Sequence, residues 1–94
     1  MEWSEYLASL GQNSPPECQP IMKSLWWDRK GNWEKAHNIA QDIHTSDGSW
    51  IHAYLHRKEG DIWNADYWYA KADKSRPETS LDEEWESLVR HFLN

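Results

Sequence analysis

The chain of 94 residues has little of several residue types, and each shortage excludes a class of protein. Its single cysteine, Cys18, cannot form an internal disulfide, which favours a reducing, cytoplasmic location. Ten Lys and Arg against sixteen Asp and Glu give a formal net charge of −6, whereas nucleic acids and anionic membranes attract clustered basic residues. No apolar run approaches the roughly 20 residues of a membrane span, and the first residues are acidic where a signal peptide is basic. We therefore expect neither a nucleic acid nor a membrane as a partner.

What the chain does contain is aromatic residues: eight Trp and four Tyr accompany one Phe, and together they make 14% of the sequence. Only 38% of the residues are apolar and the mean hydropathy is −1.01, values that alone are typical of disordered chains. Disordered segments are poor in aromatic residues, however, and each buried aromatic ring removes about 150–250 Å² from water. The composition therefore predicts one small folded domain with a core of Trp and Tyr.

Apolar residues recur at helical spacing along the chain, and turn or capping residues separate the resulting segments. The separating residues are Gly11, Pro20, Gly31, Asn32, Asp47, Gly60, Asp61, Pro77 and Ser80. We expect Asp47 to cap the fourth helix, the fifth helix to end near Ser75, and a capping box of Ser80 and Glu83 to begin the last one. No alternating strand pattern competes. The sequence predicts an all-α fold of five or six short helices.

An internal repeat organises these helices. Residues 31–36 (GNWEKA) and 60–65 (GDIWNA) superpose at a shift of 29 residues. In each copy the glycine permits a left-handed turn, Asn32 or Asp61 can cap the next helix, and the alanine allows two helices to approach closely. The repeat predicts two successive helical hairpins.

This pattern resembles tetratricopeptide and Sel1-like helical repeats over residues 20–77. The positions that carry the resemblance are Gly31, Ala36, Ala40 and Ile43 in the first copy and Gly60, Asp61, Ala65, Tyr69, Ala72 and Pro77 in the second. The stretch 25–72 is also similar to small bacterial proteins with no assigned activity. The repeat and the resemblance together predict an N-terminal helix and connector in 1–19, tetratricopeptide-like antiparallel hairpins in 20–48 and 49–77, and a terminal capping helix in 78–94.

The resemblance also implies a binding face. In such repeats the first helix of each hairpin lines a concave surface on which peptides bind, and here that surface holds Asp28, Trp50, Tyr54 and Arg57. Arg57 can stack on the two aromatic rings or bind a carboxylate through two hydrogen bonds. In the alternative interpretation Trp50 and Tyr54 belong to the core, and Arg57 pairs with Asp28 or Glu59.

Aromatic residues cover almost every side of the fifth helix, which indicates either burial all round or an interface. We expect Trp63, Tyr67 and Trp68 to form the interface of a homodimer. The acidic run at residues 82–84, by contrast, is typical of a solvated face that complements the helix dipole.

Histidines are the candidate metal ligands. His52 and His56 lie four residues apart on the fourth helix, a spacing that can bind one metal ion, and His37 or His44 can supply a third ligand. Packing between helices is favoured over metal binding, because His56 aligns with a packing tryptophan of the first copy. We therefore expect no metal and no cofactor. General acid–base chemistry by His52, His56 and Glu59 lacks an accompanying nucleophile, so an enzyme is the less favoured interpretation.

The sequence as a whole thus predicts a non-catalytic helical module that binds a protein or peptide, or a second copy of itself. The alternative is a small enzyme or metal-binding protein that uses His52, His56 and Glu59.

Overall fold

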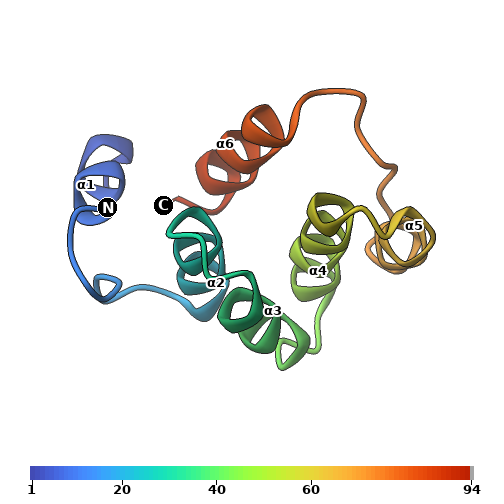
Figure 1. Ribbon diagram of the computed structural model, residues 1–94, viewed down its shortest axis with the longest axis horizontal. Helices are drawn as coiled ribbons and strands as arrows, with labels where there is room; N and C mark the ends of the chain where they lie inside the picture. Colours follow the sequence, from blue (N-terminus) through green and yellow to red (C-terminus); the bar gives the residue numbers. More distant parts are fainter. Residues whose placement is uncertain (94) are drawn as a thin grey trace.

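Six α-helices make up most of the chain in the computed structural model, which describes residues 1–93 (Figure 1). They are α1 (Trp3–Ser9), α2 (Pro20–Arg29), α3 (Trp33–Gln41), α4 (Ser46–Glu59), α5 (Ile62–Lys71) and α6 (Leu81–Phe92). No strand occurs among these 93 residues, which confirms the predicted all-α class. Within the same part of the chain, every helix is too short or too polar to cross a bilayer.

Local side-chain chemistry determines where α3 and α5 begin. Asn32 Oδ1 and Asp61 Oδ1 each accept a hydrogen bond from the backbone N–H three residues later, at 3.1 and 3.3 Å. The preceding Gly31 and Gly60 have φ angles of 88° and 89°, in the left-handed region that glycine adopts without steric cost. The turn residues of the repeat therefore act as the sequence predicted.

Two helix boundaries differ from the prediction. Thr45, and not Asp47, caps α4: its Oγ1 accepts from the backbone N–H three residues later at 3.2 Å, while Asp47 lies in the first helical turn. α5 ends at Lys71 rather than near Ser75, and Asp73 just beyond it has a left-handed φ of 58°. A residue in that conformation cannot continue a right-handed helix.

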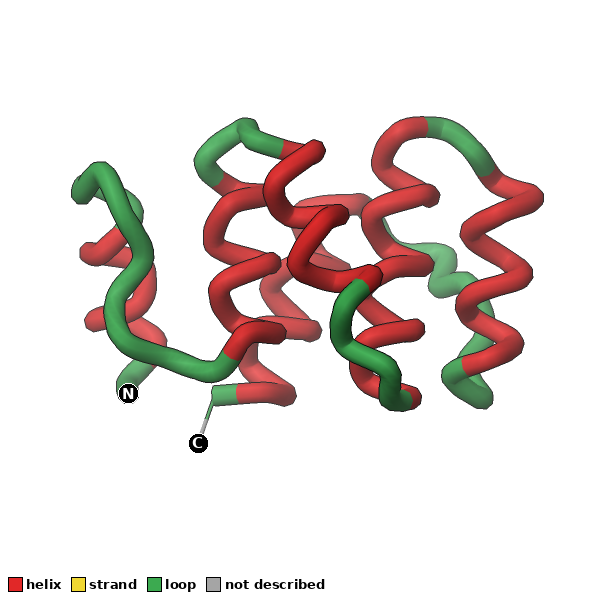
Figure 2. Tube along the Cα trace, turned by 90° about the horizontal axis from the view of Figure 1, so that it is seen from below, coloured by secondary structure: helices red, strands yellow, loops and turns green. Residues whose placement is uncertain are grey.

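The middle four helices form two antiparallel hairpins, α2 with α3 and α4 with α5, and α3 packs against α4 (Figures 1 and 2). Alanines lie at the contacts, and Ala36, Ala53 and Ala65 are completely buried. The hydroxyl of Ser24, which the repeat aligns with Ala53, donates to the carbonyl of Ala36 at 2.7 Å. Small residues at these positions let neighbouring helices approach closely.

The last helix, α6, returns after the connection of residues 72–80 and packs across α2 and α4, on the opposite side from α3 (Figure 1). The indole N–H of Trp85 donates to the carbonyl of Leu25 at 2.9 Å, and Arg29 pairs with Asp82 at 2.8 Å. Because α6 packs mainly on α2 and α4, the first helix of each hairpin, it leaves the outer face of α5 uncovered at the edge of the molecule.

Trp and Tyr supply the largest side chains of the core, in line with the composition, but buried aliphatic residues and alanines outnumber them. α1 docks through two buried hydrogen bonds, from Tyr6 Oη to the carbonyl of Met22 at 2.6 Å and from Trp26 Nε1 to Ser9 Oγ at 3.0 Å. The fully buried aromatic side chains are Tyr6, Trp26, Tyr54, Tyr69 and Trp85.

Candidate functional site

The face predicted to bind a peptide is covered by α6. Asp28 and Tyr54, two of its predicted residues, are each 1% exposed. The Tyr54 hydroxyl donates to Asp28 Oδ2 at 2.7 Å, and Lys58 Nζ lies 2.8 Å from Oδ1. Burial raises the pKa of Tyr54 above its ordinary value, so the hydroxyl stays protonated and donates. Both side chains are therefore occupied by partners inside the protein.

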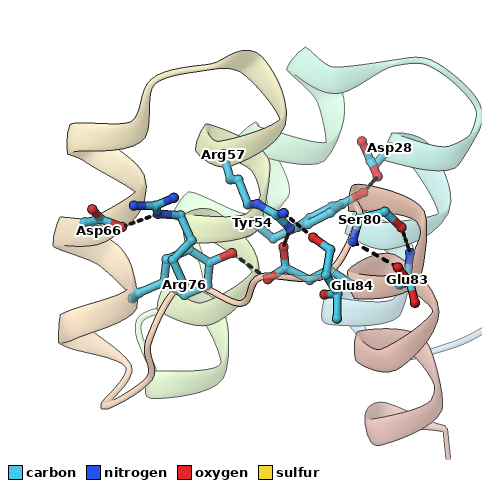
Figure 3. A network of polar contacts seen from close by, with 10 residues as sticks. Asp28, Tyr54, Arg57, Asp66, Arg76, Ser80, Glu83 and Glu84 are labelled. Atoms are coloured by element: carbon cyan, nitrogen blue, oxygen red, sulfur yellow. Dashed lines mark hydrogen bonds and ion pairs between the residues drawn. The ribbon is translucent and has the colours of Figure 1, made fainter.

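Arg57, the third predicted binding residue, links α4 to α6 (Figure 3). Its Nη1 lies 2.7 Å from Glu84 Oε1, and its Nη2 donates to the carbonyl of Thr79. The Tyr69 hydroxyl donates to the other carboxylate oxygen of Glu84, so Glu84 accepts hydrogen bonds from both α4 and α5. The acidic partner of Arg57 is thus neither of the two that the sequence suggested.

Sequence reasoning missed Glu84. It belongs to the acidic run that we expected to be solvated, and for this residue the expectation is wrong, because Glu84 is only 4% exposed. The helical spacing held a signal: Leu81, Trp85 and Leu88 form the apolar stripe of α6, and Glu84 falls within that stripe.

Trp50 of α4 lines a pocket of about 250 Å³ whose other walls are the connection of residues 72–80 and α6. Its half-buried ring packs edge to face on His91 and Phe92, with centroids 5.0 and 5.7 Å away. Lys74 Nζ stands 4.3 Å from the centre of the same ring. The cation position over this tryptophan is therefore taken by the chain's own lysine.

Three histidines from two helices meet on the other side of α4. His37 of α3 and His52 of α4 approach to 2.9 Å between their Nε2 atoms, so one ring donates a hydrogen bond to the other. His56 stacks on His52 with ring centroids 4.8 Å apart, as expected for residues four apart on a helix. One ring nitrogen from each of the three lies within 4.8 Å of the others. His37 is thus the third member of the cluster that the sequence left open.

His37, His52 and His56 are called the histidine cluster below. Neighbouring side chains hold the rings of this cluster in place. His56 Nδ1 lies 2.9 Å from Glu59 Oε2, so the predicted association of these two residues exists. His44, the other candidate third member, instead lines a neighbouring cleft of about 540 Å³ that also contains His52.

Burial sets the protonation of His37 and His52. It lowers the pKa of His52 to about 4, with further lowering by His37 and His56, and burial also lowers the pKa of His37. Both imidazoles are therefore neutral at pH 7.

We expect the free energy of unfolding to fall by about 2 kcal/mol as the pH is lowered from about 6.5 to 5 in metal-free buffer. In the unfolded chain His52 takes up a proton near its ordinary pKa of 6.5, whereas in the folded chain it does so only near pH 4. The stabilisation is therefore complete above pH 6.5 and is lost as the pH falls toward 4, at about 1.4 kcal/mol per pH unit. Urea denaturation followed by circular dichroism at several pH values measures it.

Two histidine substitutions test whether His52 causes this pH dependence, one at His52 itself and one at the control position His44. His52→Gln should remove most of the pH dependence, and His44→Gln, at an exposed position, should leave it in place. The groups that face His52 are His37 from α3, His56 from α4 and, across the neighbouring cleft, His44 and Lys71. A stability that stays constant over this pH range contradicts the prediction.

The aromatic residues of α5 divide between two surroundings. Trp68 is half-buried and stacks on His52, with ring centroids 4.1 Å apart, so it forms one wall of the histidine cluster. Trp63 is 77% exposed and Tyr67 49% exposed, and their rings lie 6.2 Å apart and nearly parallel. Of the three predicted interface residues, Trp63 and Tyr67 therefore present aromatic surface outward.

Comparisons of the chain with protein-family models, with curated proteins and with solved structures gave no match.

Proposed function

We propose that the chain is a non-catalytic protein-interaction module that self-associates through the outer face of α5. The observation that carries the proposal is the Trp63 ring, which is 77% exposed and stacked on Tyr67. Single exposed apolar residues are ordinary, but Ile62, Trp63, Tyr67 and Ala70 lie on one arc of the same helix and are all exposed. Aromatic residues in such a strip are typical of the core of an interface.

A second copy of α5, running antiparallel, fits this strip. A two-fold axis at the level of residues 66 and 67 places Trp63 opposite Ala70 of the other copy, so a large side chain meets a small one on both sides. The carboxylate of Asp66, within the strip, is already paired with Arg76 at 2.9 Å and would not be left unpaired.

The size of the strip predicts a weak dimer. Each Trp or Tyr buries about 150–250 Å² when fully covered, and the dimer would cover two of each. The total is at most about 600–1,000 Å², below the roughly 1,200 Å² of stable specific interfaces, so we expect a transient dimer with a dissociation constant on the order of 100 µM.

The resemblance to tetratricopeptide-like repeats supports the same proposal. In stacks of such hairpins each repeat buries its apolar face on the next one. Here the hairpin of α4 and α5 is the last, and α6 packs elsewhere, so a second copy would supply the missing neighbour. We place the module in the cytoplasm, a proposal supported by the single, unpaired Cys18.

Light scattering after size exclusion tests the proposal. The mass of the wild type should rise from 11.2 kDa toward twice that value as its concentration increases from about 1 to 500 µM. The double variant Trp63→Ala, Tyr67→Ala should remain monomeric throughout, because it removes all four rings from the interface.

Leu7→Ala is the matched control, since Leu7 is an exposed apolar residue on α1, far along the chain from α5. It should dimerise like the wild type. A wild type that is monomeric at every concentration, or a double variant that dimerises equally well, would refute self-association through α5.

A further inference from the structure

The histidine cluster has the composition of a metal site. Three imidazoles from α3 and α4 converge, and one nitrogen of each lies within 4.8 Å of the others. Imidazole nitrogen is a preferred ligand of Zn²⁺, Cu²⁺ and Ni²⁺, whereas Mg²⁺ and Ca²⁺ prefer oxygen. The donors thus select a transition metal.

The distances require only small side-chain movements. Zinc–nitrogen bonds of about 2.0–2.1 Å in a tetrahedral site place the ligand atoms about 3.3 Å apart. The two Nε2 atoms of His37 and His52 now lie 2.9 Å apart in a hydrogen bond, so they need to separate by a few tenths of an ångström. The third donor, within 4.8 Å of both, needs to move inward.

Side chains around the three histidines orient the rings so that a nitrogen can bind a metal ion. The Glu59 carboxylate accepts from His56 Nδ1 at 2.9 Å, which leaves Nε2 of that ring as the nitrogen with a free lone pair. A carboxylate behind a ligating histidine is the usual arrangement in zinc sites. Aromatic rings hold the other two: His37 stacks on Trp33 at 4.8 Å and His52 on Trp68 at 4.1 Å.

The charge state favours a cation as well. Burial keeps His37 and His52 neutral at pH 7 by lowering their pKa values, so neither ring must lose a net proton before it binds. The ring whose Nε2 now donates to the other must only shift that proton to its Nδ1 atom. The carboxylates of Glu59 and Asp61 lie within 4.8 Å of a His56 nitrogen and of each other. A divalent cation in the cluster would therefore have negative charge on one side.

We propose that His37, His52 and His56 bind one Zn²⁺ ion through their Nε2 atoms, with a water molecule as the fourth ligand. This site is separate from the interface on the outer face of α5. It joins α3 of the first hairpin to α4 of the second, so the bound ion would stabilise the junction between the hairpins.

Calorimetric titration with ZnCl₂ tests the proposal, because the chain supplies its own controls among its five histidines. The wild type should bind one ion per chain with a dissociation constant of about 1 µM or lower, and His37→Ala, His52→Ala and His56→Ala should each weaken binding at least 100-fold. His44→Ala and His91→Ala, which lie outside the cluster, should bind as the wild type does. Glu59→Gln should weaken binding about 10–100-fold through its effect on His56.

A second measurement guards against variants that fail to fold. Circular dichroism should show a helical His56→Ala protein, because that ring is partly exposed. A hundredfold excess of Zn²⁺ over the dissociation constant should raise the melting temperature of the wild type, and not that of the variant, by about 10–20 °C. The absence of zinc binding by the folded wild type overturns the proposal. Equal weakening by His44→Ala and His56→Ala overturns it too, because binding would then not depend on the cluster.

Discussion

Replacing Glu84 by alanine should lower the free energy of unfolding by about 3–5 kcal/mol, a large share of the roughly 5–15 kcal/mol of an ordinary domain. The reason is the set of partners that the substitution leaves behind. Arg57, whose side chain is 15% exposed, loses its counter-ion at 2.7 Å, and the buried Tyr69 hydroxyl loses its acceptor. A buried charge without a partner costs far more than a well-formed pair contributes. Urea denaturation followed by circular dichroism measures the loss.

Two companion variants separate this cause from a general effect on α6. Glu86→Ala removes a carboxylate from the same helix, but that carboxylate is half-exposed and pairs with Arg90 one turn away, so the loss should be about 0.5 kcal/mol. The double variant Arg57→Met, Glu84→Leu should recover part of the stability lost in Glu84→Ala, because no charge is then left without a partner. A Glu84→Ala protein within about 1 kcal/mol of the wild type would show that Arg57 reaches water on its own.

The features that depend on neighbouring residues were predictable from the sequence. Asn32, Asp61 and Ser80 each accept a hydrogen bond from a backbone N–H three residues later, and both partners of each bond lie within one turn of the chain. Thr45 shows where such reasoning becomes ambiguous, because Thr45 and Asp47 are both good caps and lie two residues apart. The first turn of α4 lies tightly against the connection before it, since a Cβ on Gly48 would lie 1.9 Å from the carbonyl oxygen of Ile43.

The features that depend on how helices pack were not predictable in the same way. Glu84 has a buried role only because α6 packs across α2 and α4, and helical periodicity does not state which neighbour a stripe will meet. His37 joins His52 because α3 faces α4 at that level, so a spacing of fifteen residues in sequence becomes 2.9 Å in space. Sequence spacing alone left His37 and His44 equivalent.

The tryptophans show the same division between local pattern and tertiary position. Trp63 and Trp68 lie five residues apart on α5, yet the first points outward and the second stacks on His52. One helix thereby contributes both to the proposed interface and to the wall of the proposed metal site. Loss of one site should therefore leave the other intact, which makes the two proposals separable by substitution.

Trp85→Ala and Trp63→Ala test this division directly, because the same chemical change is made at 1% and at 77% exposure. Trp85 packs on Tyr6 and lies under the guanidinium of Arg29 at 4.6 Å, and its indole N–H bonds to the carbonyl of Leu25 on α2. Its removal leaves a cavity at the place where α1, α2 and α6 meet, so we expect a loss of about 3–5 kcal/mol in the free energy of unfolding. Trp63→Ala, measured at a concentration low enough to keep the chain monomeric, should change stability by less than about 0.5 kcal/mol. If the two variants lose similar amounts, then Trp63 is part of the folded core of the monomer, and the open face of α5 on which the proposed dimer depends does not exist in solution.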